Sequence, residues 1–206
     1  MSLESRESRE ERETARMEAF SDGVFAFAIT LLALNLHDPV ANGVSLLQGL
    51  VNERAVFFAF GTSFVTVLIM WMNDHNMFNY IRRIDRRLML LNGLLLLFVV
   101  LTVYTTSLVG AHINDSESNS AAAMYAGTFL AVAIVWNGLW RYCVRGRRLL
   151  GRDVTQEQAE TITRQYSVAP VSYGAALVIA PFSGLASVAV ILAVAGFFAI
   201  TASISD

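Results

Sequence analysis

The fold is decided by one stretch, Arg16-Met17-Glu18-Ala19-Phe20-Ser21-Asp22, which runs directly into the apolar segment 23–36. A long apolar segment of this kind is typical of a membrane-spanning helix. Ionisable side chains near hydrocarbon are costly, and they usually face protein or water instead of lipid. We therefore expect this first helix to face other helices or a path for ions, and not to be a simple membrane anchor.

The composition of the whole chain also indicates an integral membrane protein. Of its 206 residues, 55% are hydrophobic and only 16% are charged, whereas soluble domains carry about 25% charged residues. The mean hydropathy is +0.51, and the apolar residues lie in blocks. The single cysteine, Cys143, excludes a disulfide within the chain and is best interpreted as a small apolar helix residue.

Six stretches are long and apolar enough to predict an all-α membrane protein with six transmembrane helices. They are residues 20–36, 55–78, 88–111, 121–144, 167–180 and 185–203. The first ends at His37-Asp38-Pro39, and the fifth, which is short, stops at Pro181. We expect residues 1–15 to form a charged tail, too acidic to belong to a signal peptide, and residues 16–206 to form the six-helix domain.

The arginines orient the six predicted helices. The chain has no lysine, and its basic residues cluster before the first stretch, between the second and third, and between the fourth and fifth. Only Arg54 falls on the opposite side. Because basic residues mark cytoplasmic loops, this distribution predicts that both termini are cytoplasmic.

The sequence lacks the signatures of common soluble enzymes. It has no G-x-G-x-x-G, Walker A, H-E-x-x-H or C-x-x-C motif, and its three histidines do not have metal-ligand spacing. The T-V-G-Y-G filter of common potassium channels is also absent. We therefore expect no enzyme activity, no cofactor, no bound metal and no nucleic-acid partner.

The first predicted helix carries an apolar face. Phe27, Leu31 and Leu34 recur at i, i+4 and i+7, and Thr30 lies beside them. Spacing alone favours a lipid-facing stripe, because any apolar helix contains such triplets.

The second predicted helix ends with a polar group at the same side of the membrane. Trp71 and His75 are at i and i+4, so they share a face and could meet Arg16 and Asp22 at one depth. An interfacial tryptophan beside a solvated histidine explains the same pattern equally well. Asn92 and Asn137 stand alone in apolar runs, where an interhelical hydrogen bond is expected.

The motif Arg16-x-x-x-Phe20-Ser21-Asp22 at the start of six spans resembles the signature of the transmembrane protein 175 family, the lysosomal and bacterial potassium channels. Residues 23–32, Trp71 with His75, and residues 80–87 also resemble that family. The resemblance covers the first three helices well and the last three weakly.

This resemblance implies a potassium channel of the plasma membrane, a homotetramer in the lipid bilayer whose pore is lined by the first helix. Instead of a carbonyl filter, it implies an apolar constriction at Phe27, Leu31 and Leu34. Thr30 matches a position linked to potassium preference. The resemblance further implies a hydrogen-bond network that holds the pore helix, made of Arg16, Phe20, Ser21, Asp22, Trp71 and His75.

Two positions depart from the family pattern. Phe27 stands where the family often has isoleucine or leucine, and Asp74 stands where a second histidine is expected. The larger phenyl ring could seal the pore more tightly or rotate as a gate. Two other hypotheses stay open: a proton-coupled or solute carrier using Asp22 and His75, and a membrane enzyme using His75 with Asp74.

Overall fold

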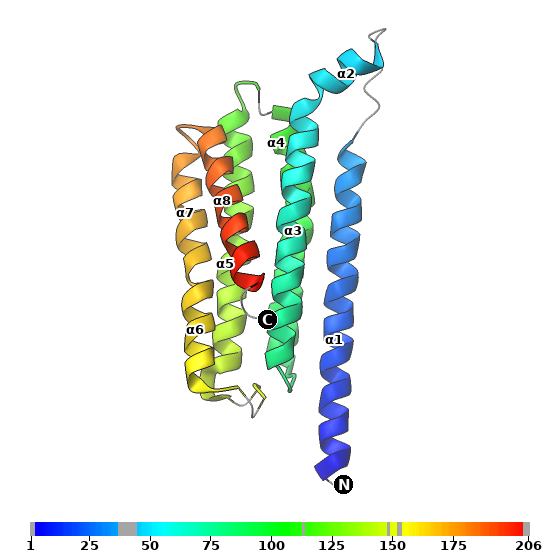
Figure 1. Ribbon diagram of the computed structural model, residues 1–206, viewed down its shortest axis with the longest axis vertical. Helices are drawn as coiled ribbons and strands as arrows, with labels where there is room; N and C mark the ends of the chain where they lie inside the picture. Colours follow the sequence, from blue (N-terminus) through cyan, green and yellow to red (C-terminus); the bar gives the residue numbers. More distant parts are fainter. Residues whose placement is uncertain (1–2, 37–44, 113, 148, 152–153, 204–206) are drawn as a thin grey trace.

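The computed structural model describes residues 3–36, 45–112, 114–147, 149–151 and 154–203, and these residues form an all-α fold (Figure 1). In chain order the helices are α1 (Leu3–Leu32), η1 (Ala33–Asn35), α2 (Leu46–Asn52), α3 (Arg54–Tyr80), α4 (Arg86–His112), α5 (Ser118–Val144), η2 (Arg145–Arg147), α6 (Gln156–Tyr166), α7 (Val168–Ile179) and α8 (Gly184–Ser203). The all-α prediction is confirmed for this part of the chain.

Four helical segments are long and apolar enough to cross a membrane: Glu10–Asn35, Arg54–Tyr80, Arg86–His112 and Ser118–Arg147. The last two predicted spans are shorter. The apolar part of α8 covers Gly184–Ile200, and α7 has only 12 residues. However, α6 and α7 are separated by Ser167 alone and stack end to end alongside α5 (Figure 1).

Two local features extend the sequence prediction. The helix α1 begins at Leu3, so it runs from the charged tail without a break into the apolar segment. The short helix α2 was not predicted. Ser45 is its N-cap, because the Ser45 side chain accepts a hydrogen bond from the Gln48 backbone N–H. The predicted helix stop at His37-Asp38-Pro39 lies outside the described residues.

The helices are unequally covered by their own chain. In Figure 1, α1 stands at one edge of the bundle, and α5 lies at the other side of the view, partly behind α6, α7 and α8. The contacts of α1 are chiefly with α3 and α4, and α5 packs against α4, α6, α7 and α8. In the most apolar 18-residue stretch of each helix, 22% is buried in α1 and 56% is buried in α5.

Buried hydroxyl groups join the long helices in the half of the bundle away from the arginine clusters. Thr106 of α4 donates to the Ser63 oxygen of α3 at 2.7 Å, and Ser63 lies 2.9 Å from the Tyr125 hydroxyl of α5. Such side-chain bonds stabilise helix association where hydrocarbon offers no alternative partner. The shared hydroxyls therefore fix the relative rotation of α3, α4 and α5.

The ends of the bundle are tied by backbone contacts. At the arginine-rich end, Ile81 and Leu150 form an antiparallel bridge between the α3–α4 turn and the segment before α6. At the other end, Asn119 of α5 accepts from the Gly184 backbone N–H at 2.9 Å. A Cβ at Gly184 would lie 2.8 Å from the Ser118 carbonyl oxygen, so glycine permits this close approach.

Candidate functional site

Helix α1 has two contrasting faces. Ser21, Phe25, Ala28 and Leu32 recur at the spacing of one helical face, and all four are fully buried against the chain. The opposite face carries large apolar side chains that the chain leaves uncovered. Phe20 is 62% exposed, Phe27 is 63% exposed and Leu34 is 72% exposed.

Thr30 and Leu31 take different positions beside this uncovered face. Thr30 is exposed and lies between Phe27 and Leu34 along the outward stripe. Its hydroxyl donates to the Phe27 carbonyl oxygen at 2.8 Å, which leaves the oxygen lone pairs free to accept. Leu31 is half-buried, so it stands at the margin of the stripe. The outward stripe is therefore apolar with one hydroxyl at its middle.

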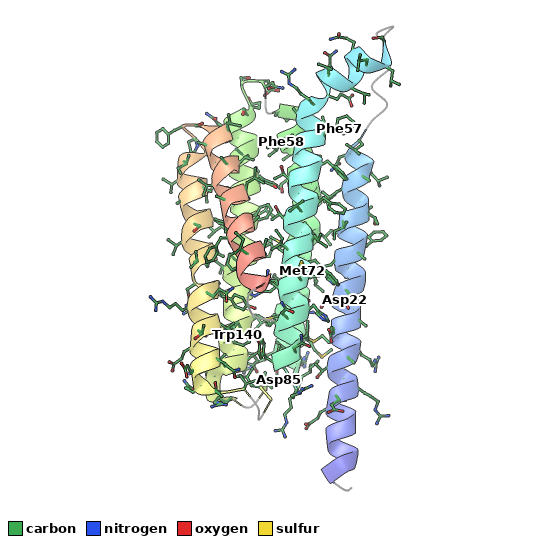
Figure 2. All side chains as sticks on the ribbon, in the orientation of Figure 1. Asp22, Phe57, Phe58, Met72, Asp85 and Trp140 are labelled. Carbon is green, nitrogen blue, oxygen red and sulfur yellow. The ribbon has the colours of Figure 1, made fainter. Side chains whose placement is uncertain are left out.

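The buried side of α1 is held to α3 by two polar contacts. The Trp71 indole N–H of α3 donates to Asp22 Oδ1 of α1 at 2.7 Å. Figure 2 shows Asp22 on α1 at the level of the neighbouring α3. His75 Nδ1 lies 2.9 Å from Glu18 Oε1. The rings of Trp71 and His75 are stacked with centroids 6.1 Å apart. Two side chains one turn apart on α3 thus meet two side chains one turn apart on α1.

A third polar contact joins α1 to α4. The Asn92 side-chain amide donates to the Ser21 hydroxyl oxygen at 2.9 Å, and both residues are buried. Ser21 and Asp22 are consecutive, so α1 is bound to two different helices at the same depth. Hydrogen bonds that point in two directions from one turn fix both the position and the rotation of α1.

The six residues predicted to form one hydrogen-bond network fall into two groups in the structure. Ser21, Asp22, Trp71 and His75 all take part in contacts at the buried side of α1. Arg16 is exposed, and within the described residues it makes no hydrogen bond or ion pair. Phe20 lies on the uncovered side.

Two partners in this network were not among the predicted site residues. Glu18 contacts His75, and Asn92 contacts Ser21. A signal for Glu18 was present, because Glu18 and Asp22 are spaced i, i+4, and this spacing matches Trp71 and His75 on an antiparallel helix. Asn92 gave a weaker signal, since a lone amide in an apolar run does not identify its partner.

Asp74 lies beside this network and is fully buried. Neither of its carboxylate oxygens has a hydrogen-bond partner among the described residues. Its nearest charged influences, Asp22 and Glu18, are also acidic. Burying an unpaired carboxylate costs free energy, so the charged form of Asp74 is unfavourable at this position beside the α1–α3 contacts. In the described residues, no group of three or more His, Cys, Asp or Glu side chains could hold a metal ion.

The chain resembles known proteins both over this site and over its whole length. The family model described as endosomal/lysosomal potassium channel TMEM175 matches residues 16–102, which include the contacts of Glu18, Ser21 and Asp22 with His75, Asn92 and Trp71. A potassium channel of Chamaesiphon minutus is 39% identical over 197 residues, covering 94% of this chain and 97% of the relative. The chain belongs to the TMEM175 family.

Other members of the TMEM175 family show the extent of the similarity. A potassium channel of Streptomyces collinus is 36% identical over 177 residues, covering 83% of this chain and 86% of the relative. The human endosomal/lysosomal proton channel TMEM175 is 40% identical over 93 residues, covering 41% of this chain and 18% of that protein. The similarity to bacterial members therefore includes α5 to α8, over which the resemblance read from the sequence was weak.

The fold agrees with a solved member of the TMEM175 family. The crystal structure of a lysosomal potassium-selective channel TMEM175 homolog from Chamaesiphon minutus matches with a TM-score of 0.84 and 37% identity. The match covers 93% of this chain and 98% of that chain. At this identity and coverage, the two chains share one architecture.

Proposed function

We propose that this chain is a potassium-permeable channel whose pore is lined by α1, with an apolar constriction in place of a carbonyl filter. The observation that carries the proposal is the uncovered stripe of α1, where Phe27 and Leu34 are more than half exposed in a chain that belongs to a potassium-channel family. A single copy offers this stripe no partner, whereas a ring of copies would direct it toward an axis.

The proposed assembly is a homotetramer in the plasma membrane, with six spans and both termini in the cytoplasm. The four long apolar helices, the apolar helix α8 and the end-to-end pair α6 and α7 support six crossings. The clustering of arginines supports the orientation. In this assembly residues 1–15 would lie in the cytoplasm, and residues 16–206 would form the channel domain.

The proposed constriction consists of Phe27, Leu31 and Leu34, with Thr30 as the hydroxyl that favours potassium. A narrow apolar ring gates by dewetting, and it selects by the cost of removing water from the ion. Potassium holds its water less tightly than sodium and so crosses at lower cost. Half-buried Leu31 would contribute less to such a ring than Phe27 and Leu34.

The polar residues of α1 have a separate proposed role. Asp22, Ser21, Trp71 and His75 would brace the pore helix, because their contacts lie on the side of α1 opposite the stripe. Arg16 and Phe20 face outward, so in a tetramer they would meet another copy or the pore mouth. A proton-coupled carrier would instead need Asp22 and His75 to exchange their partners during transport.

The test is ion flux from liposomes that contain the purified protein. We expect potassium flux to exceed sodium flux, and Phe27→Ala to raise both because it widens the constriction. Phe182→Ala is the matched control, since Phe182 is 85% exposed at the turn between α7 and α8, and it should leave flux unchanged. The absence of flux in the wild type and in both variants would refute a channel, and saturable solute counterflow would favour a carrier.

A further inference from the structure

Asp74 lies on the turn of α3 that holds α1. It follows Trp71 by three residues and directly precedes His75, and both of these residues make polar contacts with α1. Its exposed fraction is 0%, and neither carboxyl oxygen has a hydrogen-bond partner among the described residues. By contrast, Asp22 accepts from Trp71, and Asp85 accepts from a backbone N–H of α4 at 2.8 Å. Asp74 is therefore shielded from solvent without the donors that satisfy these two carboxyl groups.

The titratable groups around Asp74 offer it no counter-charge. Glu18 and Asp22 act on it from α1, and both are acidic. Tyr166 of α6 lies within electrostatic range and is uncharged in its ordinary form. The neighbouring His75 is directed to Glu18, with 2.9 Å between its Nδ1 and the carboxyl oxygen. The electrostatic surroundings of Asp74 therefore oppose a negative charge.

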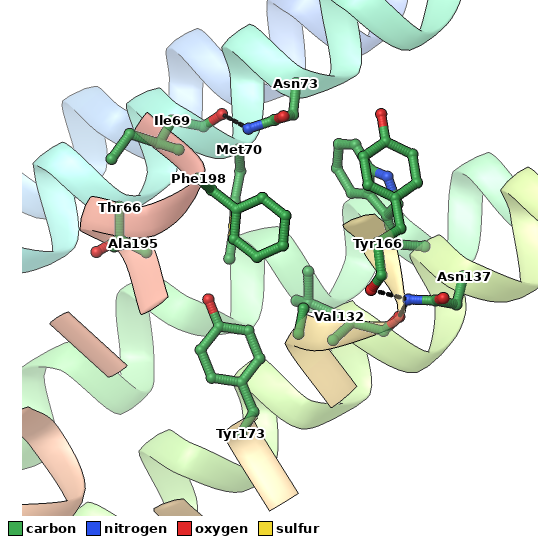
Figure 3. A pocket seen from close by; sticks show the side chains of 13 residues that line it. Thr66, Ile69, Met70, Asn73, Val132, Asn137, Tyr166, Tyr173, Ala195 and Phe198 are labelled. Carbon is green, nitrogen blue, oxygen red and sulfur yellow. Dashed lines mark hydrogen bonds between the residues drawn. The ribbon is translucent and has the colours of Figure 1, made fainter. Parts of the chain in front are cut away.

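The nearby amide groups donate to other acceptors. The Asn73 side chain donates to the Ile69 carbonyl oxygen at 2.8 Å, beside a small, mostly apolar pocket among α3, α5, α6, α7 and α8 (Figure 3). The Asn92 side chain of α4 donates to the Ser21 hydroxyl oxygen at 2.9 Å. The side-chain oxygen of Asn92 is itself buried and has no partner among the described residues. This part of the bundle therefore has more acceptors than donors.

A buried carboxyl group can be satisfied by a metal ion, a basic partner or a proton. Among the described residues, His, Cys, Asp and Glu side chains do not gather in threes that could hold a metal ion. The groups that act on Asp74 include no arginine. A proton removes the charge and turns one carboxyl oxygen into a donor. Only the proton answers both the like-charged surroundings and the shortage of donors.

We propose that Asp74 is a proton-binding site, and that its proton allows α1 to pack against α3 at this turn. The neutral group removes the repulsion from Glu18 and Asp22. Loss of the proton would place a further negative charge against α1 and weaken its packing. The arginine clusters lie at the same end of α3, so in the proposed orientation the site responds to cytoplasmic pH. That direction rests on the proposed function, whereas the proton binding does not.

Infrared difference spectroscopy tests the proton directly, because a protonated carboxyl group has a carbonyl stretch that a carboxylate lacks. We expect the wild-type protein in vesicles at neutral pH to show this band, shifted in heavy water, and Asp74→Asn to lose it. Asp115→Asn is the matched control and should keep the band, since hydrogen bonds lower the pKa of the exposed Asp115 carboxyl. A band that is absent from the wild type, or that persists in Asp74→Asn, would overturn the proposal.

Isotope labelling keeps this test independent of whether Asp74→Asn folds. Wild-type protein made with aspartate that carries heavy carbon at the side-chain carboxyl should show the band at lower frequency. A band that does not move with this label would assign the proton to a glutamate and overturn the proposal.

Hydrogen exchange tests the consequence for α1. Where packed α1 keeps the proton on Asp74 and opened α1 has released it, opening should rise about tenfold per pH unit after correction for intrinsic exchange. This rise should be absent from Asp74→Asn, which resembles the protonated form, and from α5 in both proteins. His75 is present in both, so its own titration cancels in the comparison. Equal pH dependence of α1 in the two proteins would contradict the proposal. Neither measurement uses ion flux, so each result is independent of the proposed channel function.

Discussion

Helices α1 and α5 are similar in hydropathy but very different in surroundings. The apolar window of α1 has a mean hydropathy of 1.6 and that of α5 has 1.5, yet 22% of the first and 56% of the second is buried. The environment of α5 is completed by its own chain. The chain covers only one side of α1, and the uncovered side carries Phe27, Thr30 and Leu34. Equal hydropathy can therefore accompany a structural helix and a helix that needs further copies.

The largest expected loss of stability comes from a substitution in the core of α5. Trp140 of α5 is fully buried, and its indole N–H donates to Thr163. Trp140→Ala leaves a large cavity and should lower the free energy of unfolding by about 3–5 kcal/mol. Thermal unfolding of the detergent-solubilised protein would measure it. If Trp140→Ala lowered the free energy of unfolding by less than about 0.5 kcal/mol, as a surface substitution does, then the packing of α5 would not determine the stability of the fold.

The next effect concerns the close approach of α8 to α5. A methyl group at Gly184 would meet the Ser118 carbonyl oxygen at 2.8 Å, so Gly184→Ala should cost about 1–3 kcal/mol through overpacking. Gly196→Ala on the same helix is the matched control, since no atom lies within 4 Å of a Cβ there. Equal unfolding temperatures for the two variants would show that the α5–α8 contact is loose.

The third prediction concerns the brace on α1. Trp71→Phe removes the donor to Asp22, and an interhelical bond of this kind is worth about 0.6–2 kcal/mol in membranes. Hydrogen exchange should rise in α1 and stay unchanged in α5, because only α1 loses a contact that fixes it. A uniform rise over both helices would indicate general unfolding and contradict a local brace.

The sequence predicted the long helices well because hydropathy and length determine them. Residues 55–78, 88–111 and 121–144 all fall inside α3, α4 and α5. The charged first turns of α1 lie outside the first predicted span, because hydropathy identifies only the apolar part of a helix. The short helix α2 was missed because seven residues carry too little periodic pattern.

The candidate site was predicted in part. The pairing of Asp22 with Trp71 could be anticipated from i, i+4 spacing and membrane depth. The contacts of Glu18 and Asn92 could not, since they depend on how α1 is rotated against α3 and α4. Spacing alone also could not separate a lipid-facing stripe from a pore-facing one, because both need an uncovered apolar face. The buried, unpartnered state of Asp74 arises only from tertiary packing.

The smallest expected effect lies in the loop between α4 and α5. A hydrogen bond with His112 and another from the Glu117 backbone N–H lower the pKa of the Asp115 carboxyl. Its contribution to stability is therefore present above the ordinary carboxyl range and is lost as the pH falls through the lowered value. The difference in Tm between wild type and Asp115→Asn should shrink as the pH falls from about 6 toward about 3. A difference that grows toward acid would contradict this.

The central claim is that the uncovered side of α1 faces an ion pathway, and a cysteine at Phe27 tests it most directly. The native Cys143 is buried, so a positively charged thiol reagent should reach only the introduced residue. We predict that the reagent blocks potassium flux through Phe27→Cys channels and leaves flux through Phe182→Cys channels unchanged. Full modification of the cysteine at position 27 without any loss of flux would contradict the claim and would mean that the stripe faces lipid.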